Sequence, residues 1–207
     1  MSDHRGYRGL ILDFGGVLTT PMRANGVGFE QESGLEPGAY FAALTEHPEG
    51  VHVYAELEVG RATQEDWNRV IGGILGLDPT DLMRRALARL RPEPRIVELV
   101  GRARREGMVT AMLSNSFGLT PFNVYKELGM WEGFTDVVIL SEEEGVRKPS
   151  PEIYRRTVER MGLAPEECVF VDDHERNLPP AEAMGITCVH ATDATLTEAR
   201  VRELLNW

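Results

Sequence analysis

The chain of 207 residues is long enough for one large domain, or for a core domain that carries an inserted unit. It has 33 acidic against 22 basic residues, for a formal net charge of −11, and no basic stripe that could neutralise phosphates. This excludes nucleic acid and anionic membrane surfaces as expected partners. A small anionic substrate fits the composition if a metal ion and a local cation hold it.

The sequence also indicates a cytoplasmic protein. No run of about 18 apolar residues could span a membrane, and Met1 to Tyr7 are polar and mixed in charge, unlike a secretory signal peptide. The two cysteines, Cys168 and Cys188, lie within apolar, strand-like runs. This placement favours reduced thiols in a core, with a disulfide as the less favoured alternative.

The first predicted element is a buried strand at Leu10-Ile11-Leu12, which delivers Asp13 to its end. Gly15 and Gly16 then allow the backbone to turn sharply under this carboxylate. Ligands of open α/β sheets bind at the carboxyl edge of the strands. Asp13 is therefore placed where a ligand would lie.

The stretch from Thr20 to Arg91 shows helical periodicity and no strong strand. Thr63 to Asp66 is typical of a capping box, and Asp78-Pro79 opens a further helix. After the capping box, apolar residues recur at spacings of three and four: Trp67, Val70, Ile71, Ile74 and Leu75. Residues 25–38 contain four glycines and are predicted to be mobile. We therefore expect a helical insert directly after the first strand.

From Glu93 onward, helices and strands are predicted to alternate. Helices are expected over residues 93–106, 120–128, 150–162, 178–184 and 196–205, and strands over residues 109–113, 135–140, 168–171 and 186–190. Such alternation indicates a parallel sheet with right-handed crossovers. The predicted fold is a doubly wound α/β core, residues 1–19 and 92–207, interrupted by a helical unit, residues 20–91.

Side chains that could take part in catalysis or ligand binding follow four of the predicted strands. They are Asp13, the pair Ser114 and Asn115, Lys148, and the pair Asp172 and Asp173. Phosphoryl transfer needs such a set: a nucleophile, donors for phosphate oxygens, a point cation and a hard-metal site. Each has a purely structural alternative, because such residues also form turns, helix caps and solvated loops. Those alternatives explain neither the order nor the placement of the set.

These four segments resemble, in order, the four motifs of the haloacid dehalogenase-like hydrolases. The resemblance runs from Gly9 to about Val189, with residues 20–91 matching only as a helical cap of suitable size. Residues 140–154 are similar to the third motif of the subgroup whose cap lies between motifs one and two, and residues 169–177 to its fourth motif. The resemblance implies a Rossmann-like core with a helical cap, and it does not reach a substrate.

The resemblance also implies a role for each matching residue. Asp13 would attack phosphorus and form an aspartyl-phosphate, and Lys148 would offset the charge of the carboxylates and the substrate. The phosphate oxygens would be held by Ser114, the Asn115 backbone amide and Lys148. Mg²⁺ suits an oxygen-only site, which would consist of the Asp13 carboxylate, the Gly15 carbonyl, Asp172 and Asp173.

Position 15 departs from the phosphatases of this family, which carry a second aspartate there as the general acid. General acid–base help is worth about 10²–10⁴-fold, so its loss should penalise poor leaving groups most. Two consequences are open. The substrate has a more acidic leaving hydroxyl, as in a sugar 1-phosphate, or another group replaces the acid, with His174, Glu56 and Glu58 as candidates.

Two other branches of the family differ at the same position. The dehalogenases carry tyrosine there and do not depend on Mg²⁺, whereas this chain keeps the pair Asp172 and Asp173. The phosphonate-cleaving relatives carry alanine and use a lysine of the cap, whereas residues 20–91 contain no lysine. Both comparisons disfavour these chemistries here.

The favoured function is a Mg²⁺-dependent phosphatase acting on a small phosphorylated metabolite. The alternative is a catalytically weak or inactive relative that binds a phosphorylated ligand or a protein partner. Position 15 favours the alternative, whereas Asp13, Lys148 and Asp172 favour the enzyme, because buried like charges are costly for a pure scaffold. Residues 55–63 resemble a segment near the active site of capped relatives, so Glu58 and Arg61 are candidate substrate contacts. A solvated ion pair at a helix end is the structural alternative for both.

Overall fold

A five-stranded parallel sheet forms the centre of the computed structural model, which describes residues 6–207. The strands are β1 (Gly9–Leu12), β2 (Val109–Ser114), β3 (Val137–Leu140), β4 (Cys168–Asp172) and β5 (Thr187–His190). Their order across the sheet is β3-β2-β1-β4-β5, so the strand order reverses beside β1. The carboxyl end of a strand at such a switch point is where open α/β sheets bind ligands. The predicted doubly wound α/β fold is confirmed.

The strands are continuous apolar runs because the sheet is covered on both faces. Every residue of β1 and of β4 is buried. Leu12 of β1 lies opposite Val171 of β4, and the pairing extends one step further because the Asp13 amide donates to the Val171 carbonyl at 2.9 Å. This register brings Asp13 beside Asp172, the last residue of β4.

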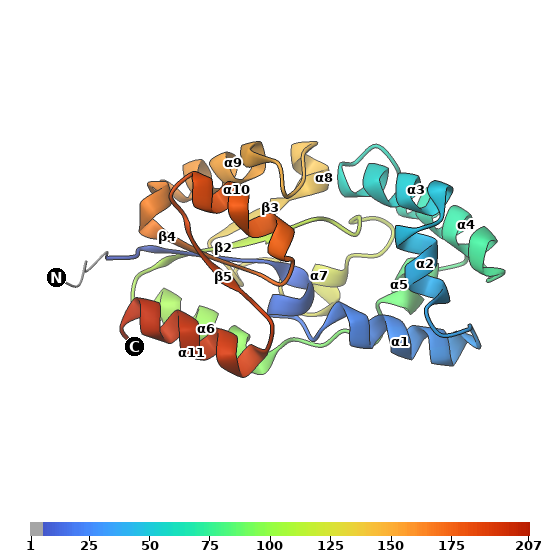
Figure 1. Ribbon diagram of the computed structural model, residues 1–207, viewed down its shortest axis with the longest axis horizontal. Coiled ribbons are helices and arrows are strands. Elements are labelled where there is room, and N and C mark those ends of the chain that lie inside the picture. Colours follow the sequence, from blue (N-terminus) through green and yellow to red (C-terminus); the bar gives the residue numbers. More distant parts are fainter. Residues whose placement is uncertain (1–5) are drawn as a thin grey trace.

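Helices cover both faces of the sheet (Figure 1). On one face lie α6 (Pro94–Arg105) and α11 (Ala194–Leu205), and on the other lie α9 (Pro151–Met161) and α10 (Leu178–Ala183). Shorter elements complete the core: α7 (Val124–Glu127), α8 (Ser141–Glu144), η2 (Pro165–Glu167) and η3 (Glu175–Asn177). The buried apolar side chains form one cluster on each face of the sheet.

A unit of five helices, here called the insert, occupies the chain between the tight turn η1 (Phe14–Leu18) and α6. It consists of α1 (Met22–Ser33), α2 (Ala39–Thr45), α3 (Pro48–Glu58), α4 (Gln64–Leu75) and α5 (Leu82–Ala86). The insert lies beyond the carboxyl ends of the strands, on the right in Figure 1. Its two connections run side by side, because Thr19 bridges Pro92 and the Thr20 amide donates to the Arg91 carbonyl at 2.8 Å.

Three local predictions differ from the structure. Residues 25–33, predicted to be mobile, belong to α1, because Gly26 and Gly28 allow close packing: a Cβ at these positions would lie 2.4 Å from Phe41 Cζ and 2.3 Å from Arg89 Nε. The helix predicted over residues 120–128 shortens to α7, since Gln64 binds the preceding loop at the Phe122 backbone. The last helix begins at Ala194 rather than Leu196, because the Asp193 carboxylate caps it.

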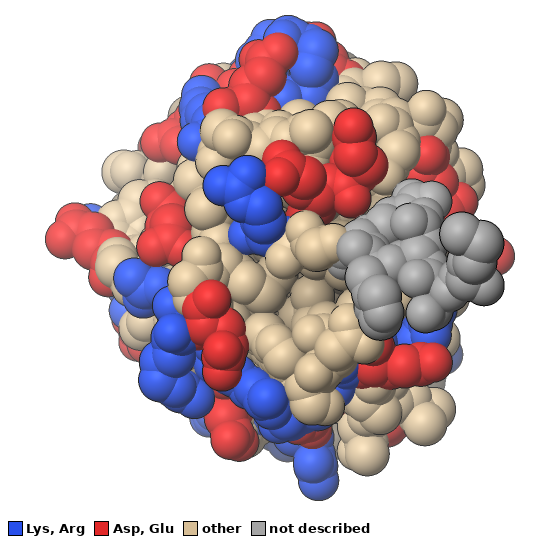
Figure 2. All heavy atoms as spheres, turned by 90° about the vertical axis from the view of Figure 1, so that its left-hand side faces the viewer, with Lys and Arg blue, Asp and Glu red and all other residues tan. Residues whose placement is uncertain are grey.

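The capping box of α4 is present as predicted: the Thr63 hydroxyl accepts from the Asp66 amide, and the Asp66 carboxylate accepts from the Thr63 amide. Among residues 6–207, no helix combines the length and the apolarity needed to cross a bilayer. Figure 2 shows the end of the molecule opposite the insert, where acidic and basic side chains are interspersed. Residues from the sheet edge and from the insert line a common pocket.

Candidate active site

The carboxyl edge of the sheet and the insert enclose a pocket with about 980 Å³ of free space, its open mouth included. Asp13, Ser114, Asn115 and Lys148 all line it, although they come from distant parts of the chain. β1 ends before Asp13, β2 ends at Ser114, and Lys148 follows α8. The structure therefore gathers these four residues, which the sequence had placed at the ends of separate strands.

Lys148 forms the electrostatic centre of the site. Its Nζ lies 2.7 Å from Asp13 Oδ1 and 2.6 Å from Asp172 Oδ2, and it donates to the Leu113 carbonyl at 3.0 Å. Its three N–H donors are all used, and its side chain is 1% exposed. Burial alone would lower the pKa of Lys148, but the two carboxylates outweigh burial and raise it. The lysine is therefore a fixed positive charge.

The Asn115 side chain fixes the Lys148 backbone. Its Oδ1 accepts from the Lys148 amide at 2.9 Å, and its Nδ2 donates to the Lys148 carbonyl at 3.2 Å. The resemblance had concerned only the backbone amide of Asn115, and the side chain's contact with Lys148 has no signal in the sequence. The Ser114 hydroxyl lies 3.0 Å from the hydroxyl of Tyr125, a buried residue of α7 that sequence reasoning had missed.

Three carboxylates, those of Asp13, Asp172 and Asp173, offer ligand oxygens that all lie within 4.8 Å of one another. Asp172 is fully buried, and its Oδ1 accepts from the His174 amide and from Asn177 Nδ2, each at 2.8 Å. A compact all-oxygen set of this kind suits a hard divalent cation such as Mg²⁺ or Ca²⁺. The residues present therefore fit a metal ion.

Gly16 allows Asp173 to approach this set. Its φ is +76°, a conformation that favours glycine, and a Cβ there would lie 2.5 Å from Asp173 Oδ2. Sequence reasoning had given Gly16 only a role in the turn. The structure adds a second requirement, which is space for the neighbouring carboxylate.

Burial shapes the protonation of the carboxylates. It raises the pKa of Asp13 to about 8, against the lowering effect of Lys148, and it also raises the pKa of Asp173. Asp172 adds to both shifts because like charges repel. The carboxylates thus carry more negative charge than one lysine neutralises, which is what a bound cation would relieve.

Apolar atoms occupy the surroundings of Gly15. Its backbone is ordinary, with φ −72° and ψ 122°, so glycine is not required by conformation. A Cβ at this position would lie 3.2 Å from both Cγ and Sδ of Met22, and 3.8 Å from Phe117 Cζ. The position that carries the acid in related phosphatases therefore faces a thioether and an aromatic ring.

The structure separates the remaining candidate residues. Glu58 lines the pocket and forms an ion pair with Arg147, while its backbone carbonyl accepts from the Ser141 hydroxyl. His174 also lines the pocket, with its Nε2 4.0 Å from Asp173 Oδ1. Glu56 and Arg61 instead pair with each other at 2.7 Å, and the pocket lining does not include them. The Arg61 side chain is 63% exposed, because it follows the end of α3 at the surface.

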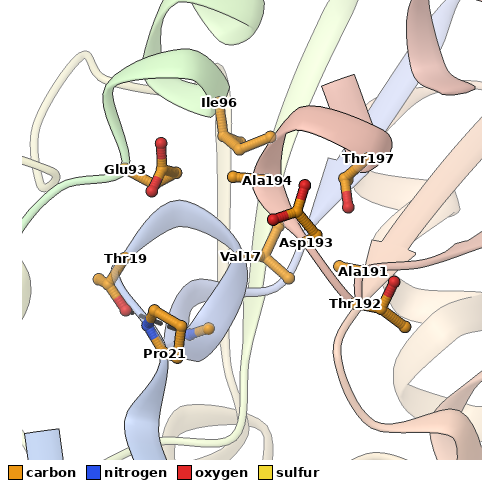
Figure 3. A pocket seen from close by; sticks show the side chains of 11 residues that line it. Val17, Thr19, Pro21, Glu93, Ile96, Ala191, Thr192, Asp193, Ala194 and Thr197 are labelled. Carbon is orange, nitrogen blue, oxygen red and sulfur yellow. Dashed lines mark hydrogen bonds between the residues drawn. The ribbon is translucent and has the colours of Figure 1, made fainter. Parts of the chain in front are cut away.

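A second, smaller pocket of about 330 Å³ lies beside η1 and the first turns of α6 and α11 (Figure 3). Glu93 and Asp193 are among its polar side chains, and both already accept from helix amides, those of Arg95 and Thr195. The buried Thr197 hydroxyl has no hydrogen-bond partner among the described residues. The two carboxylates therefore serve as helix caps in this pocket.

The family model of the haloacid dehalogenase-like hydrolases matches residues 7–185. The chain belongs to this family. It is a haloacid dehalogenase-like hydrolase whose matched region includes β1 to β4 and the whole insert.

Several family members of known name or structure are similar to the chain. Sesquiterpene phosphatase astK of Aspergillus oryzae is 27% identical over 203 residues, 96% of this chain and 97% of that protein. Glyceraldehyde 3-phosphate phosphatase of Methanopyrus kandleri is 31% identical over 103 residues, 49% of this chain and 44% of that protein. A haloacid dehalogenase family enzyme of Bacteroides thetaiotaomicron, solved as a magnesium complex, has a TM-score of 0.68 at 24% identity and covers 91% of this chain and 96% of that one. This structural likeness shows the shared fold.

Proposed function

We propose that this hydrolase is a Mg²⁺-dependent phosphatase that acts on a small-molecule phosphomonoester. The observation that carries the proposal is Lys148, buried between Asp13 and Asp172 at the end of the switch-point strand. A buried cation that neutralises two carboxylates beside an open pocket suits the chemistry of a phosphate dianion. Relatives named as phosphatases and a structural neighbour solved with magnesium support the same conclusion.

Asp13 would be the nucleophile. Its Oδ1 accepts from the Phe14 amide and Lys148 Nζ, each at 2.7 Å, which leaves Oδ2 for attack on phosphorus. The ester P–O bond would then break, with its electron pair leaving on the departing oxygen, and an aspartyl-phosphate would form. Hydrolysis of this acyl phosphate by water would release phosphate and restore the Asp13 carboxylate. Ser114 and the Asn115 amide would hold the phosphate oxygens.

The resident cation would be Mg²⁺, held by Asp13, Asp172, Asp173 and the Gly15 carbonyl. When bound, it would offset the negative charge of the phosphate beside the carboxylates. We take residues 20–91 as the cap of the enzyme and residues 1–19 and 92–207 as its core. The cap would cover the pocket because all five of its helices, α1 to α5, contribute to the lining.

The site has no carboxylic acid at position 15 to protonate the leaving oxygen. No carboxylate stands at position 15, and Met22 lies there instead. The proton would therefore come from water or from His174, which lines the pocket with its Nε2 4.0 Å from Asp173 Oδ1. We expect slow turnover of esters whose leaving group is a strongly basic alkoxide.

The test is phosphate release from 4-nitrophenyl phosphate with Mg²⁺, by the wild type and by Asp13→Asn. We expect Asp13→Asn to lose at least about 100-fold in kcat, and the wild type to form an acid-stable, hydroxylamine-sensitive phosphoenzyme. Equal activity of the two proteins would exclude Asp13 as the nucleophile.

The second candidate function, a protein that binds a phosphorylated ligand without hydrolysing it, is favoured by Gly15 alone. It predicts no phosphate release from any ester tested and no phosphoenzyme, together with Mg²⁺-dependent binding of inorganic phosphate by calorimetry. The same two measurements therefore separate the two functions.

A further inference from the structure

The pocket has two chemically different halves. The half at the sheet edge is polar and is lined by Asp13, Ser114, Asn115, Lys148, His174, Arg176 and Asn177. The opposite half comes mostly from the insert, and its wall is mainly apolar and aromatic, with Thr45 and Glu58 as polar members beside Met22, Tyr40, Phe41, Leu44, Tyr54, Trp67, Met83 and Phe117. A phosphate held beside Asp13 would occupy the polar half. The leaving group of the ester must then extend into the apolar half.

The junction of the two halves lies at Gly15. Because a Cβ here would touch Met22 Cγ and Sδ at 3.2 Å, the space next to the scissile bond is bounded by a thioether rather than by a proton donor. The leaving oxygen therefore departs toward an apolar surface. An oxygen that is stable as an anion tolerates this arrangement better than an alkoxide does.

The apolar half offers few partners for a substrate rich in hydroxyl groups. Glu58 is already paired with Arg147, and the Thr45 hydroxyl already donates to the Phe41 carbonyl at 2.9 Å, which leaves the hydroxyls of Tyr40 and Tyr54. A sugar would lose its hydrogen bonds to water on entering and regain few of them, which weakens binding. An apolar group gains from the same transfer because its surface leaves water.

We infer that the substrate is an organic phosphate whose leaving group is apolar and weakly basic as an anion. A substituted aryl phosphate has this chemistry. The inference rests on the proposed phosphatase function and replaces the sugar 1-phosphate suggested by the sequence. In the reaction, Asp13 displaces the aryloxide with the electron pair of the P–O bond, the aryloxide takes a proton from solvent, and one water hydrolyses the aspartyl-phosphate.

Three phosphate esters of similar size test the inference with Mg²⁺ present. 4-Propylphenyl phosphate is apolar and has a weakly basic leaving group, O-phosphotyrosine has the same leaving oxygen but a charged tail, and cyclohexyl phosphate is apolar but has a strongly basic leaving oxygen. We expect kcat/KM for 4-propylphenyl phosphate to exceed that for O-phosphotyrosine by about tenfold or more, mainly through KM. We also expect 4-propylphenyl phosphate to have a higher kcat than cyclohexyl phosphate, because its leaving oxygen is less basic. An equal or higher kcat/KM for O-phosphotyrosine or glucose 1-phosphate would overturn the inference.

Two variants of one helix locate the preference in the insert. Leu44→Gln places an amide in the apolar half, whereas Ala42→Gln places the same amide on α2 at a position that does not line the pocket. We expect Leu44→Gln to reduce the preference for 4-propylphenyl phosphate over O-phosphotyrosine severalfold, and Ala42→Gln to keep it. A preference unchanged in both variants would contradict the placement of the leaving group.

Binding separates failure of the inference from failure of the proposed function. Benzylphosphonate and methylphosphonate cannot be hydrolysed, and calorimetry measures their affinities with Mg²⁺. If no ester is hydrolysed, the phosphatase proposal fails. Tighter binding of benzylphosphonate would then still support an apolar ligand, and equal affinities would overturn this assignment too.

Discussion

The Met22 thioether lies against Gly15, so that a Cβ on residue 15 would be 3.2 Å from its Sδ. The contact joins the first turn of the insert to the loop that carries the nucleophile candidate. A missing acid in this protein is therefore accompanied by a side chain that fills its place. Restoring the acid requires a change at both positions.

Gly15→Asp alone should improve catalysis little, whereas Gly15→Asp with Met22→Ala should restore a general acid. A Cβ at 3.2 Å forces the thioether to shift, which we expect to cost about 1 kcal/mol of the free energy of unfolding. The double variant frees this space. Its gain on cyclohexyl phosphate should approach the typical value of about 100-fold for acid–base help, and its gain on 4-nitrophenyl phosphate should be small.

Steady-state kcat/KM on the two esters checks this prediction, with Met22→Ala as the control. Equal gains on both esters would show that the new carboxylate does not protonate the leaving oxygen.

Lys148→Met should destabilise the protein strongly, because it leaves the buried Asp172 carboxylate beside Asp13 without a counter-charge. Breaking a buried ion pair in this way costs about 3–5 kcal/mol at neutral pH. Loss of Lys148 removes the group that lowers the pKa of Asp13, so protonation at lower pH relieves the repulsion and the deficit shrinks as pH falls.

Urea unfolding in the presence of EDTA, at pH values from about 5 to 8, measures this deficit. The matched control is Lys126→Met at the chain's other lysine, which is exposed and belongs to α7. A deficit that grows as pH falls would contradict the assigned charge balance.

Much of the fold and part of the site could be predicted from the sequence. The strands could be predicted because β1 and β4 are uninterrupted apolar runs that end directly before or within acidic motifs. The alternation of helices and strands then indicated that Asp13, Ser114 and Asp172 would meet at one edge. These features are local in the sequence. Their meeting in space could be predicted because the carboxyl ends of parallel strands lie at one edge of the sheet.

The contacts between the insert and the core could not be predicted in the same way. Met22 against Gly15, and Gln64 against the Phe122 backbone, join segments whose relative placement depends on how two helical surfaces pack. No periodicity or motif encodes such a contact. Likewise, the glycines of α1 suggested mobility from the sequence alone, whereas in the structure they make room for Phe41 and Arg89.

Binding of Mg²⁺ should tighten as pH rises. Burial raises the pKa of Asp13 to about 8, so below that pH a cation must displace a proton from the site. With the metal removed, stability should fall as pH rises from the ordinary range of an aspartate toward 8, since the folded state alone keeps this proton. Mg²⁺ should offset this loss.

The measurement is the Mg²⁺-induced rise in Tm, which we expect to be larger at about pH 8.5 than at about pH 6. Asp173→Asn should lose most of the rise, and Asp193→Asn, which alters a helix cap elsewhere, should retain it. A rise that is larger at the lower pH would contradict the proton competition.

Gln64→Leu should loosen the contact between the insert and the core. The Gln64 amide donates to the Phe117 and Phe122 carbonyls, at 2.9 and 2.7 Å, and accepts from the Phe122 amide at 3.0 Å. Leucine leaves these three buried groups unpaired, which should lower the free energy of unfolding by about 2–4 kcal/mol.

Gln31→Leu at an exposed position of α1 is the matched control and should change stability by less than about 0.5 kcal/mol. Hydrogen exchange of the amides of residues 117–122 should increase in Gln64→Leu only. Unchanged protection there would show that the loop does not depend on Gln64.

Arg147 and Lys148 are consecutive residues, and they face different parts of the molecule. Arg147 pairs with Glu58 of the insert, whereas Lys148 holds Asp13 and Asp172 in the core. Any outward movement of α3 that breaks the first pair acts on the peptide next to the second, with the Asn115 side chain as the anchor that resists displacement. The residue that contacts the insert and the residue that carries the central positive charge are thus joined by a single peptide bond.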